Sequence, residues 1–174
     1  MNEKAFDQAA QFWVEKQAPE TTLPEAEVRA LAERIITSHD TCALATAVGD
    51  FVRCTPIEYT YHDGVFWIFS EGGMKFKALK ENKNVSIAIF DAFNGFANIK
   101  SIQLAGVAEL VEPFSEAYVA AAERRHISLA RLQKMPSPMH LLKITPTLIE
   151  VLDFSLRNQG YNPRQQWQVT APEH

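Results

Sequence analysis

Lys75 stands where a short chain segment could hold an anion. It follows the glycine pair Gly72 and Gly73, and it begins a segment in which Phe76 and Leu79 stand three apart, as on one face of a short helix. Free backbone amides and the positive end of the helix dipole converge at such a start, and this geometry binds phosphates. The spacing therefore indicates an anion site at Lys75.

A second cation, Arg53, falls on residues 51–61, whose alternation is typical of a strand. A guanidinium fork suits a phosphate, and a lysine nearby adds a point charge. Two alternatives stay open on spacing alone. Lys75 could belong to a solvated face, as we expect for Lys77 and Lys80, and Arg53 could be an edge-strand residue in water.

Residues 1–40 predict two helices that flank the elements carrying these cations. The first is expected to be amphipathic and to pack on the rest of the fold or on a partner, with the apolar residues Phe6, Ala9, Ala10 and Trp13. The second is expected to have Thr22 as N-cap, Pro24 and Glu25 at its start, and an end near Ser38. Its apolar face comprises Val28, Leu31, Ala32 and Ile35.

From residue 41 the pattern changes to strands. Runs of alternating or continuous apolar residues predict six strands over residues 41–48, 51–61, 65–69, 84–90, 98–111 and 140–154. A helical pair is expected over 113–134. The fold class predicted is mainly β with flanking helices, an α+β arrangement around a six-stranded antiparallel barrel that leaves no sheet edge open.

The whole chain, residues 1–174, is expected to form a single domain of three parts. These are N-terminal helices in 1–40, a barrel with inserted helices in 41–154, and an irregular tail in 155–174. In this tail, Trp167 is expected to anchor the segment on the body of the fold, and stacking on a cofactor is the alternative.

Composition excludes several classes of function. The chain is 47% hydrophobic and 22% charged, as in globular proteins, and its net charge of −4 without a basic stripe argues against nucleic acid. No stretch is long and apolar enough to span a bilayer, and the start lacks the apolar core of a signal peptide, so we expect a cytoplasmic location. Cys42 and Cys54 fall on neighbouring strands and are expected to be reduced and buried.

Other chemistries lack their signatures. The five histidines show no ligand spacing with the cysteines, so no metal is expected. Ser38, His39 and Asp40 are adjacent, and adjacent side chains diverge too far to form a catalytic triad. A glycine-rich dinucleotide motif and a P-loop are also absent from the sequence.

Residues 41–111 resemble the flavin-binding split-barrel family related to pyridoxamine 5'-phosphate oxidase, which includes many small flavoproteins and stress proteins. The separations between the matching positions fit this family without an insertion. The resemblance is carried by Arg53, Asp63-Gly64, residues 65–70, Lys75, Leu79, Asn82, residues 85–90, Gly106 and Ala108.

The resemblance implies an FMN cofactor and a homodimer whose flavin cleft lies between the subunits. Arg53 and Lys75 would hold the FMN phosphate. The backbone of Cys54, Thr55 and Pro56 would pass along the isoalloxazine, and Ile68, Phe69 and Ser70 would border the same cleft. Ser101 falls where the family often has a glutamine that reaches the flavin from the partner subunit, and Gln103 shares its strand face.

The chain also departs from the oxidase itself. Gly73 and Met74 stand where the oxidase has Ser-Arg, and the C-terminal arrangement of Arg157, Arg164 and Trp167 differs, so oxidation of a B6 vitamer is not expected. We expect an FMN-dependent oxidoreductase acting on a small substrate, and no residue is assigned as its acid or base. The alternatives are a non-catalytic flavin- or haem-binding module, with His126 or His140 as the haem ligand, and a barrel that has lost its cofactor.

Overall fold

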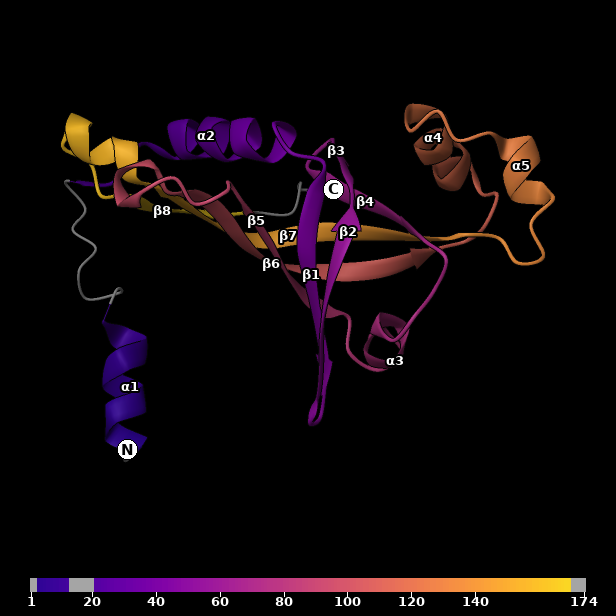
Figure 1. Cartoon of the computed structure of the whole chain (residues 1–174), viewed down its shortest axis with the longest axis horizontal. Helices are drawn as coiled ribbons and strands as arrows, with labels where there is room; N and C mark the ends of the chain where they lie inside the picture. The colour runs from indigo at the N-terminus through magenta and orange to yellow at the C-terminus, as the bar shows by residue number, and fades with distance from the viewer. Residues whose placement is uncertain (1–2, 13–20, 170–174) are drawn as a thin grey trace.

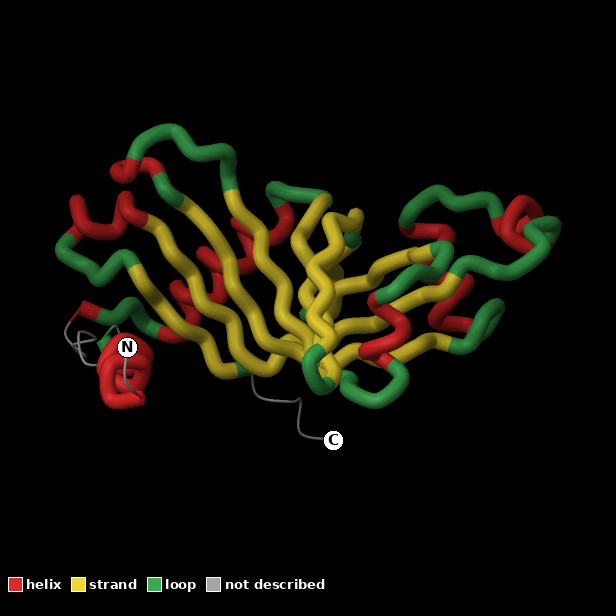
Figure 2. The backbone as a smooth tube through the Cα atoms, turned by 60° about the horizontal axis from the view of Figure 1, so that its bottom comes forward, coloured by secondary structure: helices red, strands yellow, loops and turns green. Residues whose placement is uncertain are grey.

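The chain folds into a strongly curled antiparallel sheet with helices at its ends and edges (Figures 1 and 2). The structure is a computed structural model, and it describes residues 3–12 and 21–169. Within these residues the sheet has eight strands, in the order β2-β1-β5-β6-β7-β4-β3, with β8 paired to β7. The strands are β1 Thr41–Val48, β2 Phe51–Glu58, β3 Thr60–His62, β4 Val65–Ser70, β5 Asn84–Phe90, β6 Lys100–Val111, β7 His140–Asp153 and β8 Arg164–Gln168.

The curl of the sheet follows from its two end strands. β2 and β3 lie at opposite ends of the strand order, yet only Tyr59 separates them along the chain. The sheet must therefore bend round until both ends reach the same segment. Tyr59 is fixed at this bend, because its backbone N–H donates to Asp40 O at 2.8 Å and its hydroxyl donates to Ile36 O at 2.6 Å.

The prediction of six strands is corrected to eight for two reasons. The run 51–61, predicted as one strand, is divided at Tyr59 into β2 and β3, which pair with different neighbours. The tail contributes β8, where no strand was predicted. The other predicted strands agree with β1, β4, β5, β6 and β7 to within about two residues.

Glycine is required at one point in the middle of the sheet. The β6–β7 ladder has a register shift between Ala105 and Gly106. A Cβ atom at Gly106 would lie 2.8 Å from Thr145 O, closer than any real contact of that kind. The irregularity brings the two backbones together, and only a residue without a side chain fits there.

The helix α2, Glu25–Thr37, covers one end of the curled sheet (Figure 1). Its buried residues include all four members of the predicted apolar face, and its C-cap is Ser38, as predicted. The predicted N-cap, Thr22, is wrong. Pro24 occupies the N-cap position and provides no side-chain hydrogen bond.

The first helix, α1, spans Glu3–Gln11, and none of its described residues is buried. The prediction that it packs on the rest of the fold is therefore not met by the described part, and Phe6 is exposed. Packing on a partner stays a prediction. Trp13, which was expected on the same face, lies outside the described residues.

The remaining helices are short. α3 is Lys75–Leu79, η2 is Phe96–Asn98, and η3 is Phe154–Gln159. The predicted helical pair is confirmed as α4, Glu116–Arg124, and α5, Leu129–Gln133. These two helices form a second small core with β4, in which Tyr118 packs edge-on against Phe69 at 5.3 Å.

The C-terminal segment is more regular than predicted. Residues expected to be irregular form η3 and the strand β8. Gln165 is buried on β8 and satisfied by hydrogen bonds, since its Oε1 accepts from Leu23 N at 2.9 Å and its Nε2 donates to Asn162 O at 2.6 Å. Trp167 is buried beside it, with the Arg29 guanidinium 5.3 Å over its ring. The predicted anchoring role of Trp167 is confirmed.

Both cysteines are free, but only Cys42 is buried. Cys54 is exposed, which corrects the expectation that both thiols are buried. Their register partners are Ile57 and Ala45, so the two residues do not face each other across β1 and β2. Burial, and to a smaller extent the nearby Cys54, raises the pKa of the Cys42 thiol to about 12.

Two absences hold for residues 3–12 and 21–169. No group of three or more metal-ligating side chains comes together there. No helix in this part of the chain has the length and apolar character needed to cross a bilayer.

Candidate cofactor-binding site

The Lys75 side chain is a buried cation with few partners. The residue is only 4% exposed, and its Nζ donates to Gly72 O at 2.5 Å and lies 5.3 Å from the centre of the Phe76 ring. Burial lowers the pKa of this ammonium below its ordinary value of 10.5, and the positive charge of Arg53 nearby lowers it further. Two cations therefore converge here with no carboxylate bonded to Lys75 among the described residues.

The loop before Lys75 is held open by its glycines. Gly72 and Gly73 have φ angles of +133° and +103°, which other residues rarely adopt. The Ser70 hydroxyl ties the loop to β4, since it donates to Gly72 O and accepts from Gly72 N, both at 3.1 Å. Nothing lies within 4 Å of the position a Gly72 Cβ would take, so backbone faces open space there.

The helix that follows contributes less than the sequence indicated. α3 has only five residues, and its N-cap, Met74, provides no side-chain hydrogen bond. Few peptide dipoles are aligned in so short a helix, so its field is weak. The charges of Lys75 and Arg53 therefore dominate the electrostatics of this site.

Arg53 lies on β2, directly opposite Thr46 of β1. Its guanidinium makes no hydrogen bond or ion pair within the described ranges and is exposed. Cross-strand partners share a sheet face, and Thr46 is buried with a hydroxyl that lacks a partner in the same part of the chain. A free guanidinium thus stands beside an unsatisfied buried hydroxyl, which sequence reasoning missed.

The residues predicted to border the isoalloxazine fall on both faces of their strands. On β2, Cys54 and Pro56 are exposed and Thr55 is half-buried. On β4, Ile68 is fully buried in the main core, whereas Phe69 packs on the opposite face with Tyr118. The side chains of Ile68 and Phe69 therefore cannot line one cleft together, although their backbones can border it.

Ser101 and Gln103 do not join Arg53 and Lys75 within one chain. Both lie on the outward face of β6, and two strands, β5 and β1, separate β6 from β2. Gln103 faces Ala88 on β5, in the same row as Pro56 on β2. At about 4.8 Å per strand, this row spans about 14 Å, too far for direct contact.

Trp167 is also remote from Lys75. It pairs with Ile149 of β7, whereas α3 adjoins the other end of that strand, where Phe76 and Leu142 line the same hollow. Seven residues of strand correspond to about 23 Å. The structure does not bring Trp167 to the cation pair.

His140, one of the two predicted haem ligands, is a neighbour of the site. It is the register partner of Ser70, and its ring lies 4.8 Å from that of Phe76. The signal in the sequence was weak, because His140 is simply the first residue of a strand. His126, the other predicted haem ligand, is exposed beyond the end of α4.

The sequence matches the family described as pyridoxamine 5'-phosphate oxidase over residues 27–153. The chain belongs to this family. The match includes β2, the glycine loop and Lys75, and it ends at the last residue of β7. A search of curated proteins finds no match to the chain.

Solved structures of other proteins share the fold. A FAD-binding protein from Mesorhizobium loti is 22% identical, with a TM-score of 0.56 over 70% of this chain and 89% of that one. ChuZ from Campylobacter jejuni is 16% identical, with a TM-score of 0.64 over 85% of this chain and 62% of that one. A heme-binding protein from Mycobacterium smegmatis is 20% identical, with a TM-score of 0.60 over 79% of this chain and 56% of that one.

Proposed function

We propose that this protein binds FMN and holds the flavin phosphate between Lys75 and Arg53. The observation that carries the proposal is the Lys75 ammonium, which is buried beside a second cation and bonded to a single neutral acceptor. Burying a charge without a counter-charge is costly, and a phosphate would supply the missing negative charge. The backbone of the open glycine loop would also contact this phosphate.

The rest of the flavin would extend from the phosphate along β2. The backbone from Cys54 to Pro56 and the backbone of β4 at Ile68, Phe69 and Ser70 would border the ring. A flavin supplies hydride and electron transfer, and the chain's own part would be to bind and orient it. Membership of the oxidase family and the FAD-binding neighbour support a flavin over other cofactors.

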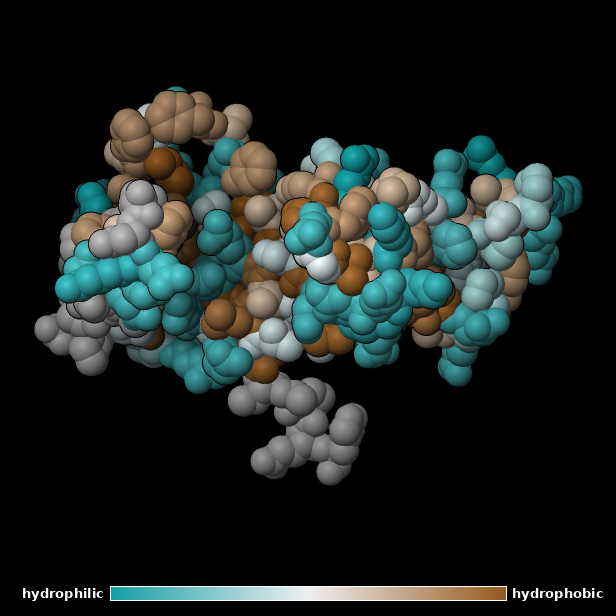
Figure 3. All heavy atoms as spheres, turned by 90° about the horizontal axis from the view of Figure 1, so that it is seen from below, coloured by the Kyte–Doolittle hydropathy of each residue, from teal (hydrophilic) through white to brown (hydrophobic). Residues whose placement is uncertain are grey.

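The proposal includes a homodimer in which Ser101 and Gln103 reach the flavin of the partner subunit. They cannot reach the Arg53 of their own chain, but they lie on an outward face. Large apolar side chains are exposed nearby. Phe90 on β5 lies beside Ser101, and Phe93 and Phe96, which follow β5 along the chain, are exposed by 71% and 75%, respectively. In Figure 3, hydrophobic side chains lie among hydrophilic ones over the middle of the face seen from below. Such exposure is typical of a surface that is covered in an assembly.

We infer an oxidoreductase acting on a small molecule rather than the B6 oxidase itself. Gly73 and the exposed Met74 take the place of the Ser-Arg pair, so the phosphate has fewer side-chain ligands. No side chain at the site is assigned as a proton donor or acceptor.

A haem-binding module is the second candidate, and His140 favours it. This half-buried imidazole lies beside Ser70 and Phe76, at the same end of the sheet as Lys75. Imidazole is a common axial ligand of haem iron. The heme-binding neighbour from Mycobacterium smegmatis supports this candidate at the level of the fold.

The absorption spectrum of the purified protein separates the candidates. The protein is mixed with FMN or with haem, and excess ligand is removed by gel filtration. Retained flavin bands at close to one per subunit are the expected result. A Soret band with no retained flavin would favour the haem module, and a colourless protein after both additions would contradict both proposals.

A further inference from the structure

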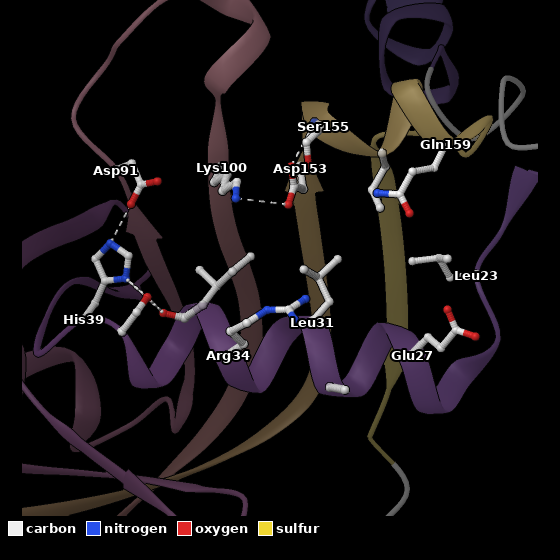
Figure 4. Close-up of a pocket in the computed structure, with 14 residues that line it drawn as sticks. Leu23, Glu27, Leu31, Arg34, His39, Asp91, Lys100, Asp153, Ser155 and Gln159 are labelled. Atoms are coloured by element: carbon white, nitrogen blue, oxygen red, sulfur yellow. Dashed lines mark hydrogen bonds and ion pairs between the residues drawn. The ribbon is translucent and has the colours of Figure 1, made fainter.

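A second cavity, of about 520 Å³, lies between α2 and the ends of β6 and β7 (Figure 4). Lys100 and Asp153 mark this end of the β6–β7 ladder, whereas Ala108 and Leu142, which adjoin α3, mark the other. The cavity is therefore separate from the Arg53–Lys75 site. Its volume is in the range of small-molecule sites.

Two side chains of α2 enter this cavity without partners. Glu27 and Arg34 are seven residues apart, so they share a helix face about 10 Å apart along the axis. Neither side chain has a hydrogen bond or ion pair within the described chain, whereas Arg29 of the same helix pairs with Glu33 at 3.0 Å. In Figure 4 both unpaired side chains rise from α2 on the side of Lys100, Asp153 and Gln159.

The opposite wall holds a cation with spare donors. Lys100 Nζ lies 3.7 Å from Asp153 Oδ2, a loose contact that uses one of its three donors. Asp153 is 3% exposed and depends less on this lysine, because its Oδ1 accepts from Ser155 N at 2.9 Å and Ser155 Oγ at 2.6 Å. The Lys100 ammonium is thus free to bind another acceptor.

Asp91, the acidic residue at the far edge of the cavity, is already hydrogen-bonded to His39. Asp91 Oδ1 lies 2.9 Å from His39 Nε2, and His39 Nδ1 lies 2.9 Å from Ile35 O. Asp91 therefore does not neutralise Arg34. Of the two cations of the cavity, Arg34 makes no ion pair within the described chain and Lys100 contacts Asp153 only loosely. Both lie above an apolar floor that includes Leu31 and Leu156.

We propose that this cavity binds a small organic monocarboxylate, with its carboxylate between Arg34 and Lys100 and its apolar body against Leu31 and Leu156. A guanidinium fork and an ammonium together match the two oxygens of a carboxylate. A single negative charge suits the site better than a phosphate dianion, because Asp153 and Asp91 lie on the same walls. The unpaired Glu27 disfavours a second acidic group on the ligand.

The test uses hexanoate as the probe and hexanamide, which has the same chain without the charge, as its control. Binding to the flavin-free protein is followed by ligand-observed NMR, so the result does not depend on the flavin proposal. We expect saturable binding of hexanoate and at least tenfold weaker binding of hexanamide, about the loss for one hydrogen bond to a charged group.

Variants on both walls of the cavity locate the site. Arg34→Gln and Lys100→Gln are each expected to weaken hexanoate roughly tenfold or more, whereas Arg29→Gln leaves it unchanged. Arg34 is exposed, so its replacement does not threaten the fold, and thermal unfolding checks this. The proposal is overturned if hexanoate does not saturate, if hexanamide binds equally well, or if Arg34→Gln and Arg29→Gln behave alike.

Discussion

Lys75 combines burial with a positive charge, and the two oppose each other when no anion is bound. Its lowered pKa means that the folded chain holds the Lys75 proton less tightly than the unfolded chain does. Between that lowered pKa and the ordinary value of 10.5, the unfolded state binds more protons, so folding stability from this group rises with pH. At neutral pH the charged lysine costs stability.

Replacing Lys75 with Met should therefore stabilise the flavin-free protein near neutral pH. The advantage of Lys75→Met over the wild type should shrink as the pH rises through the lowered pKa of the folded lysine toward the ordinary value of 10.5, because the folded wild type loses this proton first. Urea unfolding at a series of pH values measures it, with Lys80→Met, an exposed position on the next turn, as the control. A variant less stable than the wild type at neutral pH would contradict this account.

The sequence identified the residue types of the site but not their burial. Lys75, Lys77 and Lys80 look alike in the sequence, and the structure buries Lys75 alone while the other two are exposed as predicted. The register of β1 against β2, which no local pattern sets, places the unsatisfied Thr46 hydroxyl opposite Arg53.

At the scale of elements, Tyr59 joins the end of α2 to the bend between β2 and β3. Its buried hydroxyl donates to Ile36 O at 2.6 Å, and burial, followed by the nearby Cys42 and Asp40, raises its pKa. Tyr61, two residues on, packs on the same Phe66 ring, yet its buried hydroxyl has no partner in the described chain. Tyr61 therefore serves as the control for the hydrogen bond of Tyr59.

We expect Tyr59→Phe to lower the free energy of unfolding by about 1 kcal/mol, the usual value of a hydrogen bond. Tyr61→Phe should leave it unchanged or raise it slightly, because the variant removes an unsatisfied buried hydroxyl. Urea unfolding of both variants provides the comparison. Equal effects from the two substitutions would rule out the Tyr59 hydroxyl as a specific link.

The sequence predicted most elements because their apolar periods were clear, as in α2 and β5. It missed β8, where Gln165 occupies an inward position and is satisfied by hydrogen bonds to Leu23 and Asn162. An amide at a buried position hides the alternation that identifies a strand. The sequence pattern also predicted β2 and β3 as one strand. The bend between them is imposed by hydrogen bonds from Tyr59 to Ile36 and Asp40, which lie outside that run of residues.

At the scale of the whole molecule, the proposed homodimer completes the flavin site. Phe90 is exposed at the end of β5, directly beside Ser101, and we expect it to be covered by the partner subunit. Phe90→Lys should raise the dimer dissociation constant about tenfold or more, as expected for an aromatic residue within an interface.

Sedimentation velocity over a range of concentrations measures this effect. Glu123→Lys introduces a positive charge on the exposed face of α4 and should leave the dimer intact. A wild-type protein that stays monomeric at high concentration, or a Phe90→Lys variant that dimerises as well as the wild type, would exclude this face as the interface.

The central claim is that Lys75 and Arg53 bind the phosphate of a flavin, and the affinity of FMN relative to riboflavin, which lacks the phosphate, tests it most directly. Fluorescence quenching titrations should show that the wild type binds FMN more tightly than riboflavin. Lys75→Met and Arg53→Ala should each weaken FMN by roughly 1.5 to 3 kcal/mol, the range for hydrogen bonds to charged groups, and leave riboflavin unchanged. Equal affinity of the wild type for FMN and riboflavin, or unchanged FMN affinity in both variants, would contradict the account.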